Sequence, residues 1–235
     1  LSGIGPADHL RAVGVPVVAD LPGVGANLQD HLKISVRWRG RGVLPPSTVT
    51  AGLFTWSRPE QMNDERRRQP PDLQFYVGRG LDVRDSFVTI TASLVQPRSR
   101  GEIRLRSGHP MDVPVCRANY LQSPEDLDVL VSGVRLAREF GNARAFDALR
   151  AEEVEPGGEA TTAGAVGAFV RRSLDTIYHV AGTCRMGRDG GAVVDPALRV
   201  RGVEGLRVAD ASIMPEVVNA TTHAACVMIG EKAAD

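Results

Sequence analysis

Apolar and polar residues alternate with a period of two in four stretches of the first half of the chain. The longest stretch places four apolar side chains on one face: Val88, Ile90, Ala92 and Leu94. Alternation of this kind predicts strands of an antiparallel sheet that has one buried face and one wet face. The predicted strands are Lys33–Trp38, Leu73–Val77, Phe87–Val95 and Glu102–Arg106.

The apolar period becomes helical from residue 123 onward. Ser123 is the predicted N-cap, Pro124 the first helical residue and Asp126 the acid of a variant capping box, and the helix ends at Gly141. The acidic, glycine-rich stretch 152–162 is predicted to be a loop. Other helices are predicted over Ala143–Arg150, Ala163–Leu174 (capped by Thr162) and His223–Ala234. Strands followed by helices indicate an α/β protein of the α+β kind.

Composition indicates an ordinary globular protein. The chain has 235 residues, 43% hydrophobic and 24% charged, with zero net charge, so nothing favours nucleic acid or an acidic membrane surface. Neither an apolar run long enough for a membrane span nor a signal-peptide pattern is present. The three unclustered cysteines favour reduced thiols in the cytoplasm over disulfides or a metal site. Because the chain opens at Leu1, within a motif, we expect it to be part of a longer protein.

The candidate chemistry gathers in the last stretch, Tyr178–Asp235. His179 precedes a small, turn-rich segment, and the apolar run 206–209 is predicted to be a strand that ends in Asp210. His223 opens the last predicted helix. Two histidines, a polar strand end and a helix N-terminus are the components of an acid/base site that faces an electron-poor or anionic ligand.

A glycine-rich loop near the start, residues 23–28, invites comparison with a dinucleotide-binding turn. Leu28 stands where that fingerprint needs its third glycine, and no buried strand leads into the loop. Taken alone, the loop is predicted to be a tight turn rather than a phosphate cradle.

Several blocks together resemble the C-terminal half of a glucose–methanol–choline (GMC) flavin oxidoreductase of the choline-dehydrogenase-like kind. Each block is unspecific, but their order and spacing cover nearly the whole chain. The blocks are Leu1–Pro6, Gly23–Leu28 with Asp30 and His31, Pro97–Arg106, Asn119–Leu121, Tyr178–Gly187, Val194–Asp195, Gly205–Ser212 and Met228–Asp235.

The resemblance implies the C-terminal part of a two-domain FAD-linked reductase fold. Residues 1–32 and 176–235 would belong to the FAD domain, and residues 33–175 would form the substrate domain, an antiparallel sheet with helices. The glycine-rich strand–turn–helix that grips the ADP half of FAD in the family has no counterpart in this sequence. We therefore expect the N-terminal FAD-binding half as a partner, and poor FAD binding by these 235 residues alone.

The resemblance also assigns roles to individual residues. His179 would take the hydroxyl proton of an alcohol, His223 would hold the same oxygen, and hydride would go to flavin N5. The remaining matched positions would contact the cofactor: Ala224 and Ala225 at the pyrimidine edge, Asp210 and Ala211 near the phosphate and ribityl chain, and Asn27 in the glycine-rich block.

Other polar residues carry plainer interpretations. His9 and His109 are interpreted as structural or surface residues, and His31 is left open because it lies in a matched block. Cys184 is interpreted as a packing residue, Asn219 as a turn or capping residue, and Arg185 as either a substrate contact or a solvated charge. Val180 departs from the proline that often follows the base in the family, and many members carry asparagine where this chain has His223. Both departures weaken the case for a choline-type substrate.

Three functions stay open from the sequence. The first is FAD-dependent oxidation of a small-molecule alcohol at its CH–OH group. The second is a flavin-containing lyase of the same family that cleaves a cyanohydrin-type substrate without net redox change. The third is an inactive fragment. An aromatic content of only 5% argues mildly against a pocket for a quaternary ammonium group.

Overall fold

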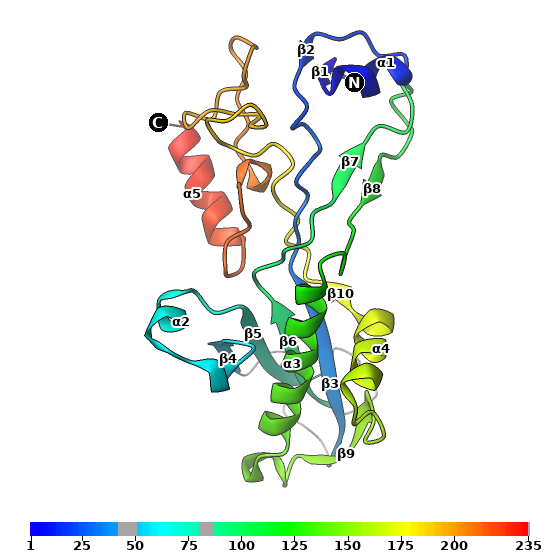
Figure 1. Ribbon diagram of the computed structural model, residues 1–235, viewed down its shortest axis with the longest axis vertical. Helices are drawn as coiled ribbons and strands as arrows, with labels where there is room; N and C mark the ends of the chain where they lie inside the picture. Colours follow the sequence, from blue (N-terminus) through cyan, green and yellow to red (C-terminus); the bar gives the residue numbers. More distant parts are fainter. Residues whose placement is uncertain (42–50, 80–86, 235) are drawn as a thin grey trace. The chain divides into compact units, whose positions relative to one another are not determined.

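The computed structural model describes residues 1–41, 51–79 and 87–234 (Figure 1). The chain forms two compact units and passes between them repeatedly. The first unit contains Leu1–Asp30, Ser99–Gln122 and Tyr178–Asp235, and the second contains His31–Arg98 and Ser123–Ile177. The assignment of 1–32, 33–175 and 176–235 to flavin and substrate domains stays a prediction. Residues 99–122, which that assignment placed in the middle segment, cluster with the first unit.

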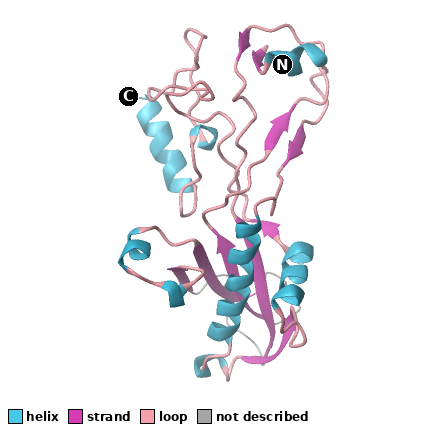
Figure 2. Cartoon of the chain, in the orientation of Figure 1, coloured by secondary structure: helices cyan, strands magenta, loops and turns pink. Residues whose placement is uncertain are grey.

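The second unit is built on an antiparallel sheet of six strands (Figure 2). Its order is β10-β3-β6-β5-β4, and β9 also pairs with β3. The antiparallel sheet with helices is the predicted fold class, and the four predicted strands are present, with adjusted ends, as β3, β5, β6 and, in the first unit, β7. The strands of this sheet are β3 (Leu32–Gly40), β4 (Ala51–Thr55), β5 (Leu73–Arg79), β6 (Phe87–Leu94), β9 (Arg150–Glu155) and β10 (Asp175–Thr176).

Helix α3 (Pro124–Gly141) packs on β3, β5 and β6, and it also contacts α4 (Ala163–Ser173). Every second residue of β3 is buried, which is the alternation that predicted the strand. Close approach is possible because α3 carries small residues: a Cβ at Gly133 would lie 2.9 Å from the Cβ of Ala92 on β6. The smaller elements of this unit are η1 (Pro59–Gln61), α2 (Asp64–Arg68) and η2 (Arg144–Phe146).

The first unit has little regular structure. A short parallel pair joins β1 (Ile4–Gly5) and β2 (Ala19–Asp20) around α1 (Ala7–Ala12), and β7 (Glu102–Arg104) pairs with β8 (Val115–Arg117). Its core gathers residues from loops, from η3 (Ala211–Ile213) and from α5 (His223–Ala234). The buried members are Ala181, Val193, Val194, Leu198, Val200, Ile213, Met214, Val217 and Ile229.

Three helix predictions are confirmed closely, and α3 spans the predicted residues Pro124–Gly141. Helix α5 spans the predicted residues His223–Ala234, and α4 begins after Thr162, whose Oγ1 accepts a hydrogen bond from the N–H of Ala165 at 3.2 Å. The predicted capping box at the start of α3 is not formed. Ser123 donates its hydroxyl proton to the carboxylate of Glu125, and the buried Asp126 accepts from the N–H of Arg98 at 2.8 Å. Asp126 therefore anchors the preceding loop instead of the helix N-terminus.

Two segments differ from their predicted structure. The predicted helix Ala143–Arg150 is only the single 3-10 turn η2, and the predicted loop 152–162 contributes to strand β9. Ion pairs explain why so acidic a segment forms a strand: Glu152 contacts Arg39 of β3, and Glu153 lies 2.8 Å from Arg138 of α3.

The predicted strand 206–209 is also wrong. The chain there makes an isolated bridge between Arg199 and Arg207, and it hydrogen bonds back to residues 198–200 across a turn. Gly202 and Gly205 both have a φ of +71°, a left-handed conformation that glycine adopts without strain within this turn. A compact glycine turn, not a sheet, leads to Asp210.

Across residues 1–41, 51–79 and 87–234, no helix is both long and apolar enough to cross a membrane. Within the same ranges, no group of three or more histidine, cysteine, aspartate or glutamate side chains is arranged to hold a metal ion.

We expect Gly141→Ala to destabilise the protein. An added Cβ would lie 2.3 Å from Cη2 of Trp38, a side chain that is 1% exposed in the core. Overpacking of this kind lowers the free energy of unfolding by about 1–3 kcal/mol. The matched control is Gly164→Ala in α4, where an added Cβ meets nothing within 4 Å. Urea denaturation should give a lower midpoint for Gly141→Ala alone, and equal midpoints would contradict the packing described.

Candidate active site

His179 lies at the start of the last segment of the first unit, in a loop with an unusual backbone. The preceding residue, Tyr178, has a φ of +63° and a side chain that is 76% exposed. A left-handed conformation at a bulky residue costs about 1–3 kcal/mol and persists only where the surroundings hold it. The surroundings do so here, because hydrogen bonds fix the chain on the C-terminal side of Tyr178.

The first of these hydrogen bonds comes from a buried aspartate. The main-chain N–H of His179 donates to Oδ1 of Asp30 at 3.0 Å. The other oxygen of that carboxylate, Oδ2, accepts the hydroxyl proton of Tyr120 at 2.6 Å. Asp30 is 4% exposed, so its charge is stabilised by these donors rather than by bulk water.

The environment of His179 favours the neutral imidazole. The side chain is partly buried, and this burial lowers the pKa of His179 below its ordinary value of 6.5. The negative charge of Asp30 opposes the effect by attracting a proton, but burial is the larger cause. A histidine with a lowered pKa is deprotonated near neutral pH, which is the state that a general base requires.

The segment 27–30 hydrogen bonds to other parts of the first unit as well as to His179. Gln29 and Ala181 exchange two main-chain hydrogen bonds, at 3.0 Å and 2.9 Å. The side-chain amide of Gln29 donates to the carbonyl oxygen of Pro215 at 3.0 Å and accepts from the N–H of Val217 at 3.2 Å. Gln29 therefore ties the segment after His179, through its main chain, to the segment that leads into α5, through its side chain.

Asn27 reinforces the same connection. Its Nδ2 donates to the carbonyl oxygens of Gly182 and Pro215, each at 3.2 Å, and its Oδ1 accepts from Nε of Arg100 at 3.1 Å. Gly182 has a φ of +92°, and a Cβ there would lie 2.5 Å from the carbonyl oxygen of Asn27. The segments that contain Asn27 and Gly182 can approach this closely only because residue 182 is glycine. A contact between Asn27 and a cofactor stays a prediction.

His223 is the first residue of α5, a helix of twelve residues, and it is exposed. Ala225, Ile229 and Ala233 turn toward the core of the first unit, whereas Ala224 is exposed. The first N–H groups of a helix have no intrahelical partners, and small side chains leave them accessible. The donor set at this helix end therefore fits a ring edge that carries negative charge or hydrogen-bond acceptors.

Asp210 and Ala211 lie at the beginning of η3. Oδ1 of Asp210 accepts from the N–H of Ser212 at 2.7 Å and so caps this short helix. The carbonyl oxygen of Ala211 accepts from the N–H of Gly182 at 3.2 Å. Hydrogen bonds thus connect Asn27, Gly182 and Ala211, and α5, which begins at His223, packs against the same core.

Two neighbours of His179 have structural roles. Cys184 is half-buried against the core, and burial raises the pKa of its thiol, in keeping with its interpretation as a packing residue. The guanidinium of Arg185 pairs with Asp189, at 2.9 Å between Nη1 and Oδ2. Of the two interpretations left open for Arg185, this contact favours a local ion pair.

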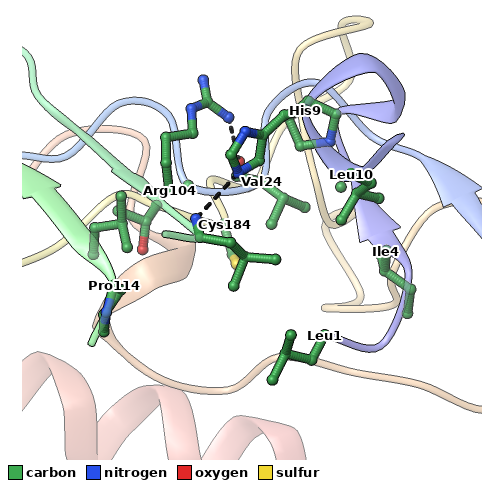
Figure 3. Close-up of a pocket in the computed structure, with 14 residues that line it drawn as sticks. Leu1, Ile4, His9, Leu10, Val24, Arg104, Pro114 and Cys184 are labelled. Atoms are coloured by element: carbon green, nitrogen blue, oxygen red, sulfur yellow. Dashed lines mark hydrogen bonds between the residues drawn. The ribbon is translucent and has the colours of Figure 1, made fainter. Parts of the chain in front are cut away.

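A cavity of about 260 Å³ in the first unit contains the side chain of His9 (Figure 3). Nε2 of His9 accepts from the N–H of Leu105 at 3.1 Å, and Nη1 of Arg104 donates to the carbonyl oxygen of Val24 at 3.3 Å. The rest of the lining is mainly apolar, including Leu1, Ile4, Leu10 and Pro114. His9 is engaged with the backbone, as its structural interpretation requires. His109 is exposed, and His31 is fully buried in the second unit.

Sequence reasoning did not identify Asp30, Tyr120 or Gln29 as functional residues. Asp30 and Tyr120 both stand in blocks that carried the family resemblance, but their types alone do not reveal that they are partners. They are 90 residues apart in sequence, and only the fold shows that one carboxylate joins Tyr120 to His179.

Comparisons with known proteins agree with this architecture. The chain is 36% identical, over 270 residues, to an alcohol dehydrogenase [acceptor] of Pseudomonas putida, and the match covers 100% of this chain and 48% of that protein. It is 38% identical, over 271 residues, to an oxygen-dependent choline dehydrogenase of Sinorhizobium medicae, again over 100% of this chain and 48% of the relative. The chain therefore spans about half the length of the curated relatives it matches.

A solved structure also matches nearly the whole of this chain and about half of its own. The crystal structure of pyridoxine 4-oxidase from Mesorbium loti superimposes with a TM-score of 0.90 and 30% sequence identity, over 99% of this chain and 47% of that chain. A family model described as GMC oxidoreductase matches residues 97–230, which is more than half of the chain. On these grounds the chain belongs to the GMC oxidoreductase family.

Proposed function

We propose that this chain supplies the acid/base residues for FAD-dependent oxidation of a small alcohol at its CH–OH group. The observation that carries the proposal is the environment of His179. Its backbone is fixed by the buried Asp30, and burial lowers the pKa of its imidazole. Membership of a family of oxidoreductases supports the reaction class, and the matched relatives carry the names of dehydrogenases and an oxidase.

The proposed role of His179 follows from the chemistry of alcohols. An alkoxide expels hydride far more readily than an alcohol, so the hydroxyl proton must be removed as the C–H bond breaks. Neutral His179 would accept that proton. His223 would hydrogen bond the same oxygen, because an imidazole can donate or accept one hydrogen bond there. FAD, when bound, would supply the acceptor for the hydride at its N5 position.

Other residues of the chain would hold the cofactor. The N–H groups near Ala224 and Ala225, at the positive end of the α5 dipole, would face the flavin ring where negative charge gathers on reduction. Asp210 and Ala211 would lie toward the ribityl and phosphate part. The dinucleotide-binding half of the site would come from the remaining half of the protein, because this chain spans 48% of the relatives it matches.

We expect His179→Ala to abolish rapid flavin reduction by alcohol. Removing a general base slows the step about 10²- to 10⁴-fold. His223→Asn should be milder, since asparagine still hydrogen bonds the oxygen. The measurement is anaerobic stopped-flow reduction of the full-length, flavin-bound protein, with the exposed His109→Ala as control. Reduction at the normal rate in His179→Ala, with the flavin spectrum intact, would rule out the base assignment.

The pH dependence of flavin reduction provides a second test. Because the base must be neutral, the rate is full at high pH and falls as the pH drops through the pKa of His179. Burial places that pKa below 6.5, so the acid limb of the rate profile should have its midpoint below pH 6.5. A midpoint above this value that disappears in His179→Ala would contradict the described environment.

A further inference from the structure

The buried carboxylate of Asp30 has no role in the proposed chemistry so far, yet it contacts the loop of the proposed base. It is 4% exposed and accepts hydrogen bonds from Tyr120 at Oδ2 and from the main chain of His179 at Oδ1. A carboxylate is costly to bury, and a cap for one loop N–H does not require a full negative charge. Its charge and its placement therefore call for an explanation beyond stability.

We propose that Asp30 is a positioning residue for His179, that it fixes the loop of this base through the main chain, and that its charge stabilises the imidazolium formed when the base takes a proton. The inference rests on the proposed function of His179. It adds Tyr120, whose hydroxyl holds the carboxylate in the orientation that His179 needs.

The geometry supports the first part of this role. The loop is held on the C-terminal side of Tyr178 at two successive points: at residue 179 by Asp30, and at residue 181 by the paired hydrogen bonds with Gln29. Asp30 and Gln29 are adjacent in sequence, so a single rigid segment sets both points. Misplacement of a catalytic group by even 1 Å can cost about 100-fold in rate, which makes such a segment functionally important.

The charge supports the second part. The proton leaves the alcohol hydroxyl and arrives on the imidazole of His179, which then carries a positive charge in a partly buried site. The carboxylate of Asp30 attracts that charge, while the hydroxyl of Tyr120 is a neutral donor. The segment 27–30 also binds a positively charged side chain, because Nε of Arg100 donates to Oδ1 of Asn27. Asp30 thus provides a negative charge close to the protonated base.

Asp30→Asn separates the charge from the geometry. An asparagine oxygen still accepts from the N–H of His179, and its amide donates to the hydroxyl of Tyr120, so these two hydrogen bonds are kept while the charge is lost. Asp30→Ala removes both, and Tyr120→Phe removes one hydrogen bond and keeps the charge. The control is Asp8→Asn, whose carboxylate is fully exposed in the same unit.

Two readouts are measured on the full-length protein with its flavin bound. The first is the titration midpoint of the His179 imidazole by NMR with labelled histidine, assigned with His179→Ala. The second is the limiting rate of anaerobic flavin reduction by alcohol. Asp30→Asn should lower the midpoint by about 1 pH unit, because the opposite charge is gone. Asp30→Ala should lower the limiting rate at least about tenfold while the substrate dissociation constant changes less than about threefold.

The inference is overturned if the midpoint is unmoved in Asp30→Asn, or if Asp30→Ala keeps the unmodified rate. Should Asp30→Ala not fold, Tyr120→Phe replaces it: a rate reduced several-fold supports the inference, and an unchanged rate overturns it. Failure of the proposed function gives a different result, because then the unmodified protein shows no flavin reduction by alcohol. The NMR titration remains decisive for Asp30 in that case.

Discussion

The candidate site depends on one short segment, residues 27–30, whose hydrogen bonds reach across most of the chain. Asp30 binds His179, 149 positions away, and Gln29 binds Val217, 188 positions away. Each contact orders long stretches of chain, so each is favourable only because neighbouring contacts share the entropic cost. The segment thus binds both the loop of His179 and the residues that precede helix α5, which begins at His223.

Regular structure in the first unit is sparse, so polar side chains pair the main-chain groups that a sheet would pair. The amides of Asn27 and Gln29 satisfy carbonyl and N–H groups that strands would otherwise pair, at Gly182, Pro215 and Val217. Buried amide networks are stable only when their members are satisfied, and they then fix a single arrangement. That property suits the proposed site, in which two histidines would act on one substrate atom.

Local patterns were sufficient for much of the fold. Alternation predicted the main strands of the second unit, and helical spacing predicted α3, α4 and α5. Segments whose structure depends on distant partners were not predictable in this way: β9 forms because its glutamates meet Arg39 and Arg138. For the site, motif resemblance identified His179 and His223 as candidate residues. The hydrogen bond between Tyr120 and Asp30 became visible only in the folded structure. The sequence contains no local signal for such a pair.

The central claim, that the site removes the hydroxyl proton and the carbinol hydride of an alcohol, is tested most directly by isotopic substitution. The flavin-bound protein is mixed anaerobically with an alcohol that carries protium or deuterium at the carbinol carbon, and the oxidised flavin absorbance is followed. The account predicts that the flavin is reduced and that deuterium slows the reduction several-fold. A flavin spectrum that stays oxidised while the substrate is consumed would contradict it and indicate lyase chemistry without net electron transfer.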